Sequence, residues 1–85
     1  MQSFEYTIKD PVGLHARPAG LLVKCAKDCS SDIRLKKGDQ SADAKRLFAV
    51  MGLDVKQSDK ITISAEGAKE AEDLAKLMRL CENNL

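Results

Sequence analysis

Two hydrophobic periodicities alternate along this 85-residue chain, and their order limits the folds that it can adopt. Apolar side chains recur at every second residue over residues 4–8, 32–36 and 61–64, which is the period of a half-buried strand. The turn signal Lys37-Gly38-Asp39 predicts a hairpin and a short strand over residues 40–43. Helical spacing is found over about residues 16–27 and 45–52. A terminal helix has the predicted apolar stripe Ala71, Leu74, Ala75, Met78 and Cys81.

The predicted order of elements is therefore βαββαβα, with no internal repeat, linker or low-complexity segment. We expect one domain over residues 1–85, which is a typical length for a small single core. Alternation within the strands indicates that the two faces of the sheet differ, one meeting helices and one meeting water. This pattern favours an α+β fold with a mostly antiparallel sheet and its helices on one side.

The bulk properties exclude several classes of protein. A formal net charge of +1 gives no electrostatic reason to expect nucleic-acid binding. A hydrophobic content of 44% without a long apolar run is too low for a membrane span, so we expect no insertion into a membrane. The first residues, Met1–Tyr6, have neither the basic start nor the apolar stretch of a signal peptide. We therefore expect a cytoplasmic protein.

The three cysteines, Cys25, Cys29 and Cys81, do not form a disulfide framework or a zinc motif, because their number is odd and no C-x-x-C pair occurs. Cys25 and Cys29 lie one helical turn apart, which leaves a soft-metal or redox pair as an alternative. We expect all three to be buried or half-buried free thiols.

The segment Gly13–Gly20 contains the only histidine of the chain and places it where a helix should begin. Pro18 suits a first helical turn, because the N–H that it lacks would have no partner within the helix. His15 should then lie at or just before the N-cap, beside free N–H groups and the positive end of the helix dipole. Arg17 can add a fork of charged donors for an anion. An imidazole is also a competent nucleophile near neutral pH, so His15 is a candidate carrier of a phosphoryl group.

The motif Gly13-Leu14-His15-Ala16-Arg17-Pro18-Ala19 resembles the signature of HPr, the histidine-containing phosphocarrier family of the phosphoenolpyruvate-dependent sugar phosphotransferase system. The resemblance extends to Lys45–Leu53, to Lys60–Gly67 and to the overall length, so it covers almost the whole chain. It implies an open-faced β-sandwich in which four antiparallel strands have the order 1-4-2-3 and three helices lie on one face. The strand order is implied by the resemblance and does not follow from the periodicity.

The resemblance also implies a function. His15 is expected to accept a phosphoryl group on Nδ1 from enzyme I, charged by phosphoenolpyruvate, and to pass it to IIA domains of sugar transporters, with Arg17 assisting. Such a protein is a stoichiometric carrier rather than an enzyme, needs no cofactor and is expected to be a monomer. No metal site is expected, because one histidine without a ligand cluster cannot complete a zinc shell. A regulatory paralogue, acting in a nitrogen-type phosphorelay or on a transcription regulator, remains the alternative.

The predicted helix over residues 45–52 is too short to bury all of its apolar residues. We expect Val50 and Leu53 to face the core and Leu47, Phe48 and Met51 to form an exposed patch that binds partners. The resemblance extends this partner surface to Gly20, Leu21 and Lys24. Arg46 occupies the position of a serine that a dedicated kinase phosphorylates in HPr proteins of many low-GC Gram-positive bacteria, so no regulatory serine is expected there.

Overall fold

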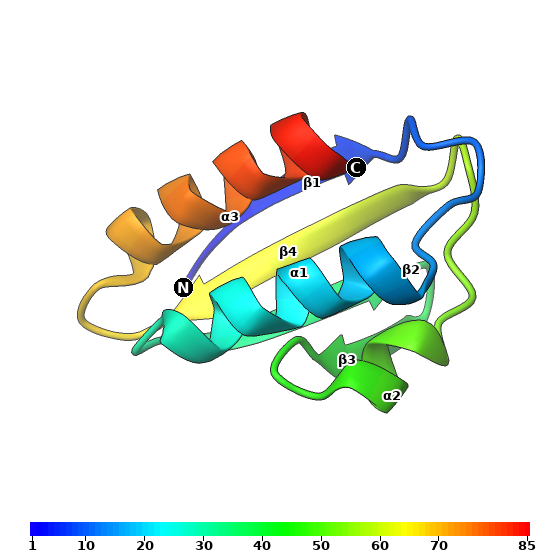
Figure 1. Cartoon of the computed structure of the whole chain (residues 1–85). Helices are drawn as coiled ribbons and strands as arrows, with labels where there is room; N and C mark the ends of the chain where they lie inside the picture. The colour runs from blue at the N-terminus through cyan, green and yellow to red at the C-terminus, as the bar shows by residue number, and fades with distance from the viewer.

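The computed structural model describes all 85 residues and has the predicted βαββαβα order. Figure 1 shows the path of the chain, with the C-terminal end of the last helix beside the loop that follows the first strand. The elements are β1 (Gln2–Thr7), α1 (Ala16–Asp28), β2 (Asp32–Lys37), β3 (Gln40–Asp43), α2 (Leu47–Met51), β4 (Lys60–Glu66) and α3 (Glu70–Asn84).

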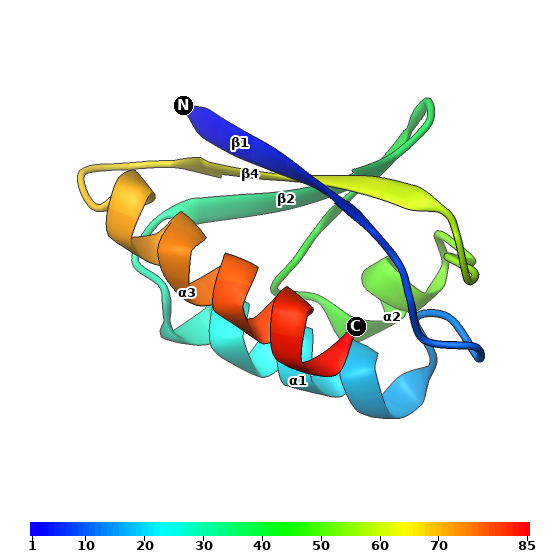
Figure 2. The same cartoon turned by 90° about the horizontal axis from the view of Figure 1, so that it is seen from above.

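The four strands form one antiparallel sheet in the order β1-β4-β2-β3, which confirms the order that the family resemblance implied. All three helices lie on one face of this sheet, as Figure 2 shows, and the opposite face is open. The hairpin between β2 and β3 pairs Lys37 with Gln40, so its turn is Gly38-Asp39, as predicted. Gly38 has a φ of +58°, a conformation that glycine adopts without steric cost.

Alternation in the central strands gives the sheet its apolar inner face. Ile33 and Leu35 of β2 and Ile61 and Ile63 of β4 are fully buried, and Leu35 lies directly opposite Ile63. The helices complete a core of 21 buried apolar residues, with fully buried side chains such as Leu22 of α1. One buried face and one polar face are what alternation predicts for a sheet covered on one side.

Two details of the helices differ from the sequence-based expectation. Helix α2 spans only Leu47–Met51 instead of residues 45–52. Lys45 lies before the helix, and its side-chain Nζ donates to the Cys29 carbonyl at the end of α1, at a distance of 3.1 Å. The apolar stripe predicted for α3 is also partly wrong. Leu74 and Cys81 are buried, but Ala71, Ala75 and Met78 are exposed, and Leu77 and Asp73 are buried instead. The buried residues of α3 differ from the predicted ones because packing against the sheet and α1 decides which face of the helix is buried. Periodicity alone does not determine that face.

The cysteines are free thiols, with Cys25 half-buried and Cys29 and Cys81 buried, as expected. Burial raises the pKa of the Cys29 thiol to about 11 and that of the Cys81 thiol to about 12. Burial also raises the pKa of Cys25. All three are therefore protonated at neutral pH, which does not favour a soft-metal or redox pair because thiolate is the form that reacts and binds metal.

Candidate phosphoryl-acceptor site

His15 is the N-cap residue of α1, as predicted, with an extended backbone conformation. Its carbonyl accepts the first helical hydrogen bond, from the N–H of Ala19, at 2.9 Å. The imidazole makes no capping hydrogen bond, and the N–H groups of Ala16 and Arg17 donate to no protein acceptor. No acidic residue lies in the first turn of α1. The positive end of this helix is therefore left uncompensated, which suits a bound anion.

The imidazole of His15 has one nitrogen directed at a carboxylate. Its Nε2 lies 3.7 Å from Oδ2 of Asp10, an ion-pair distance longer than a hydrogen bond. No hydrogen bond or ion pair involves Nδ1. The side chain is 39% exposed, so a reacting group can approach it. The sequence reasoning missed Asp10, because an aspartate before a proline and a glycine has the same pattern as an ordinary turn residue.

The loop that carries His15 is fixed against the segment between α2 and β4. Gly13 has a φ of +77°, and a Cβ on it would lie 2.5 Å from the carbonyl oxygen of Val55. The N–H of Leu14 donates to that same oxygen at 3.0 Å. Glycine is thus required at position 13 both for its backbone conformation and for this close approach. The sequence indicated a loop here, but not the contact that makes glycine necessary.

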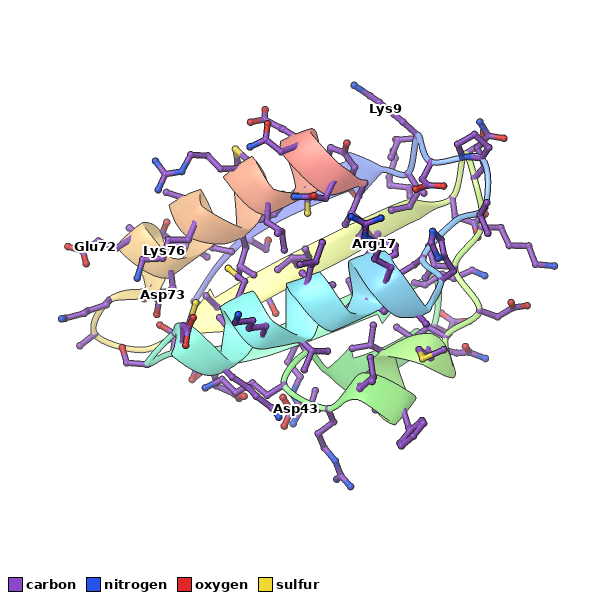
Figure 3. The ribbon with its side chains drawn as sticks, viewed as in Figure 1. Lys9, Arg17, Asp43, Glu72, Asp73 and Lys76 are labelled. Atoms are coloured by element: carbon purple, nitrogen blue, oxygen red, sulfur yellow. The ribbon has the colours of Figure 1, made fainter.

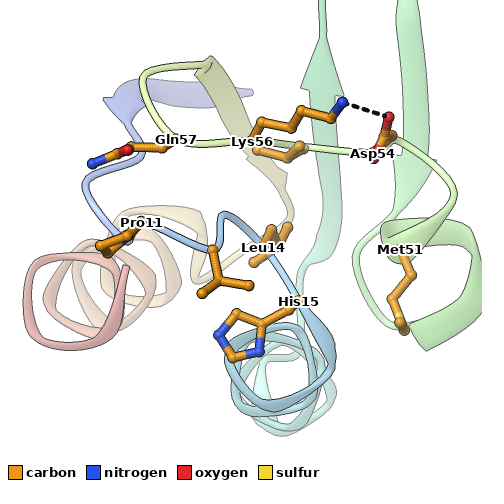
Figure 4. Close-up of a pocket in the computed structure, with 9 residues that line it drawn as sticks. Pro11, Leu14, His15, Met51, Asp54, Lys56 and Gln57 are labelled. Carbon is orange, nitrogen blue, oxygen red and sulfur yellow. Dashed lines mark ion pairs between the residues drawn. The ribbon is translucent and has the colours of Figure 1, made fainter.

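Two hollows flank the imidazole of His15. The larger, about 490 Å³, is closed on its far side by Met51 and by the segment Asp54–Gln57, as Figure 4 shows. Within it, Nζ of Lys56 lies 3.7 Å from the carboxylate of Asp54. The smaller hollow, about 260 Å³, has walls formed by Asp10, Arg17, Pro18, Leu21, Asn83 and Asn84.

Arg17 therefore lies in the wall beside His15, as the motif predicted, and its position on α1 is shown in Figure 3. Asn83 and Asn84 belong to the last turn of α3, and Asn83 lies 68 residues after His15 in the chain, so nothing in the sequence connected them with His15. The structure thus adds the end of α3 to the surroundings of the candidate site.

The residues predicted to bind partners lie on the neighbouring helices α1 and α2. Phe48 is 86% exposed, and Leu21 and Met51 are each more than a third exposed. Lys24 is exposed, whereas Gly20 and Leu47 are half-buried, and Leu47 packs partly against the core. Val50 and Leu53 are buried, as predicted. Leu21 and Met51 line the two hollows, so this predicted surface borders His15 on both sides.

Arg46 is exposed and forms the N-cap of α2 without a capping hydrogen bond. No cluster of three or more histidine, cysteine, aspartate or glutamate side chains is arranged to hold a metal ion. None of the helices combines the length and the hydropathy that a membrane span requires.

Comparison with known proteins identifies the family. A family model described as the PTS HPr component phosphorylation site matches residues 2–83. The chain belongs to the HPr family. It is 39% identical over 85 residues to the phosphocarrier protein HPr of Mycoplasma genitalium, with 99% of this chain and 97% of that protein covered. It is 49% identical over 74 residues to HPr of Buchnera aphidicola, with 84% and 87% covered.

A crystal structure of HPr-C-His from Thermoanaerobacter tengcongensis superposes on this chain with a TM-score of 0.94 at 38% identity. The alignment covers 99% of this chain and 94% of that one. The protein is accordingly an HPr phosphocarrier of the phosphotransferase system and not an enzyme. Membership of this family implies interaction with enzymes of that system.

Proposed function

We propose that this HPr protein accepts a phosphoryl group on Nδ1 of His15 from enzyme I and passes it to IIA domains of sugar permeases. The observation that carries the proposal is the position of His15 at the uncompensated start of α1. There the N–H groups of Ala16 and Arg17 have no protein acceptor, and Nδ1 has no partner. A helix end of this kind stabilises an anion by about 0.3–1 kcal/mol. That is enough to favour a phosphoryl group without trapping it.

In the transfer step, the lone pair of Nδ1 attacks the phosphorus of the phosphorylated donor. An N–P bond forms on His15, and the bond between phosphorus and the donor breaks, with its electron pair returning to the donor. The developing charge on the phosphoryl oxygens meets the free amides at the start of α1 and the guanidinium of Arg17. The reverse sequence transfers the group to the next acceptor.

Labelling from phosphoenolpyruvate tests this proposal. Purified enzyme I and phosphoenolpyruvate should place one phosphoryl group on the wild-type protein and none on His15→Ala. The bond should be labile in acid and stable in base. The His15 side chain makes no capping hydrogen bond, so the variant should keep its circular dichroism spectrum. Full labelling of folded His15→Ala would refute the assignment.

A panel of purified IIA domains separates sugar transport from the regulatory alternative. If the labelled protein passes its phosphoryl group to a sugar-type IIA domain at a rate matching its own labelling, it serves transport. Transfer only to a nitrogen-type IIA domain would identify the regulatory paralogue. Both outcomes depend on His15, so the labelling experiment has to come first.

A further inference from the structure

Asp10 occupies a central position in the loop that precedes His15. Its N–H donates to the carbonyl oxygen of Leu85 at 3.0 Å, and its carbonyl accepts from the N–H of Gly13 at 2.9 Å. Its carboxylate oxygen Oδ1 accepts from the N–H of Val12 at 2.9 Å. The second oxygen, Oδ2, accepts no hydrogen bond and lies 3.7 Å from Nε2 of His15. The carboxylate is thus fixed in place before it meets the histidine.

We propose that Asp10 is a positioning residue for His15, holding the proton on Nε2 and leaving the Nδ1 lone pair free to accept the phosphoryl group. This inference rests on the proposed phosphoryl transfer to His15. A neutral imidazole carries one proton, and a carboxylate facing Nε2 favours the tautomer with the proton on that nitrogen. Nδ1 is then the nitrogen with the lone pair, and no hydrogen bond or ion pair occupies it.

The same contact becomes stronger during the reaction. When Nδ1 bonds to phosphorus, the proton remains on Nε2 and the ring acquires positive charge, while the electron pair of the broken bond leaves with the donor. The Asp10 carboxylate then faces a cationic N–H group rather than a neutral one. Hydrogen bonds between charged partners are shorter and stronger than neutral ones. A contact of 3.7 Å in the unphosphorylated protein is therefore expected to shorten in the phosphorylated protein.

Two substitutions separate the charge of Asp10 from its role in the loop. Asp10→Asn keeps an oxygen that can accept from the N–H of Val12 but removes the negative charge. Asp10→Ala removes both. Asp54→Asn is the matched control, because it removes a carboxylate that pairs with Lys56 and not with His15. Asp54 has a φ of +53°, which asparagine tolerates.

The first measurement is the tautomer of His15, from the 15N chemical shifts of the two ring nitrogens in the unphosphorylated protein at a pH where the ring is neutral. The ratio of the Nε2–H to the Nδ1–H tautomer should fall about two- to fivefold in Asp10→Asn, the range that a partly exposed ion pair supports. Asp10→Ala should change it as much, and Asp54→Asn should leave it unaltered. An Asp10→Asn variant with the wild-type tautomer ratio would overturn the proposal, even if the ratio changed in Asp10→Ala. Asp10 would then act only by holding the loop in place and not through its charge.

The second measurement is the rate of phosphoryl acceptance from phosphorylated enzyme I. Asp10→Asn should lower the maximal transfer rate about two- to fivefold, with little change in the concentration that gives half-saturation, because the charge acts on the ring and not on docking. A change confined to half-saturation would overturn the proposal. The tautomer measurement needs no enzyme I. If the wild-type protein were not phosphorylated on His15, the proposed function would be refuted. The tautomer ratio would still test whether Asp10 positions the proton of His15.

Discussion

The starts of helices α1 and α3 differ sharply in charge, although both helices are long and pack on the same face of the sheet. The first turn of α3 contains Glu70, Glu72 and Asp73, whereas the first turn of α1 contains no acidic residue and has Arg17 instead. Carboxylates near a helix start neutralise its dipole and stabilise the helix. Helix α3 follows this rule, and α1 departs from it. The departure occurs at the helix whose N-cap is His15, so local stability is lower where an incoming anion is expected.

Asp73 illustrates the stabilising arrangement at the start of α3. It is only 2% exposed, and its Oδ2 accepts a hydrogen bond of 3.0 Å from the N–H of Ser31, 42 residues away in the sequence. Figure 3 shows this carboxylate between the start of α3 and the end of α1. It therefore joins α3 to the turn between α1 and β2, whereas the start of α1 keeps its amides free.

The largest effect is expected from removing this carboxylate. Asp73→Ala should lower the free energy of unfolding by about 2–3 kcal/mol, because the buried N–H of Ser31 loses a charged acceptor. Labelling of His15 should continue in the folded fraction. Urea denaturation and enzyme I labelling measure the two properties. Loss of labelling in a variant that is still folded would show that the two helix starts are not independent.

The contribution of Asp73 also depends on pH in a definite direction. Hydrogen bonding from Ser31 outweighs desolvation and holds the pKa of Asp73 below its usual value. Its stabilising effect is therefore present above the ordinary pKa of an aspartate and is lost as the pH falls through the lower pKa of the folded state. Denaturation curves of the wild type and Asp73→Asn should converge as the medium is acidified through that range. Curves that stay equally far apart would contradict the assigned direction.

Exposed apolar residues on α2 and α3 give the next comparison. Phe48 of α2 lies on the surface that borders His15, whereas Met78 is a 40% exposed apolar residue of α3. Phe48→Asp should weaken binding to enzyme I by about 2 kcal/mol, or roughly thirtyfold, with an unchanged fold. Met78→Asp should leave the affinity unaltered. Titration calorimetry measures both, and equal losses would place the docking surface elsewhere.

The smallest effect is expected from making α1 resemble α3. Ala16 is exposed in the first turn of α1. Ala16→Glu should raise the free energy of unfolding by about 0.3–1 kcal/mol and slow phosphoryl acceptance, because its carboxylate competes for the positive helix end. Ala71→Glu, in the already acidic first turn of α3, should give little or no stabilisation. Thermal unfolding and transfer kinetics measure the two variants. Faster transfer in Ala16→Glu would refute the view that a free helix start serves the reaction.

Much of the candidate site could be predicted from the sequence because its signals are local. Pro18 and the apolar spacing after it placed the start of α1 next to His15, and the structure has His15 as the N-cap. The turn Gly38-Asp39 likewise fixed the β2–β3 hairpin. Helix starts and two-residue hairpin turns depend mainly on neighbouring residues, so local sequence signals can predict them. The sequence predicted the buried face of α3 only in part. Leu77 and Met78 both fit a helical stripe, but in the folded protein Leu77 is buried and Met78 is exposed.

By itself, the sequence determined the order of the elements, the helix start at His15 and the absence of acidic residues from the first turn of α1. Tertiary structure alone decided what surrounds that start. The approach of Val55 to Gly13, the placement of Asn83 near Arg17 and the bond from Ser31 to Asp73 all join segments that are distant in the chain. Such contacts form when the sheet and helices pack into one core. The spacing of residues along the chain does not predict which distant segments will come into contact.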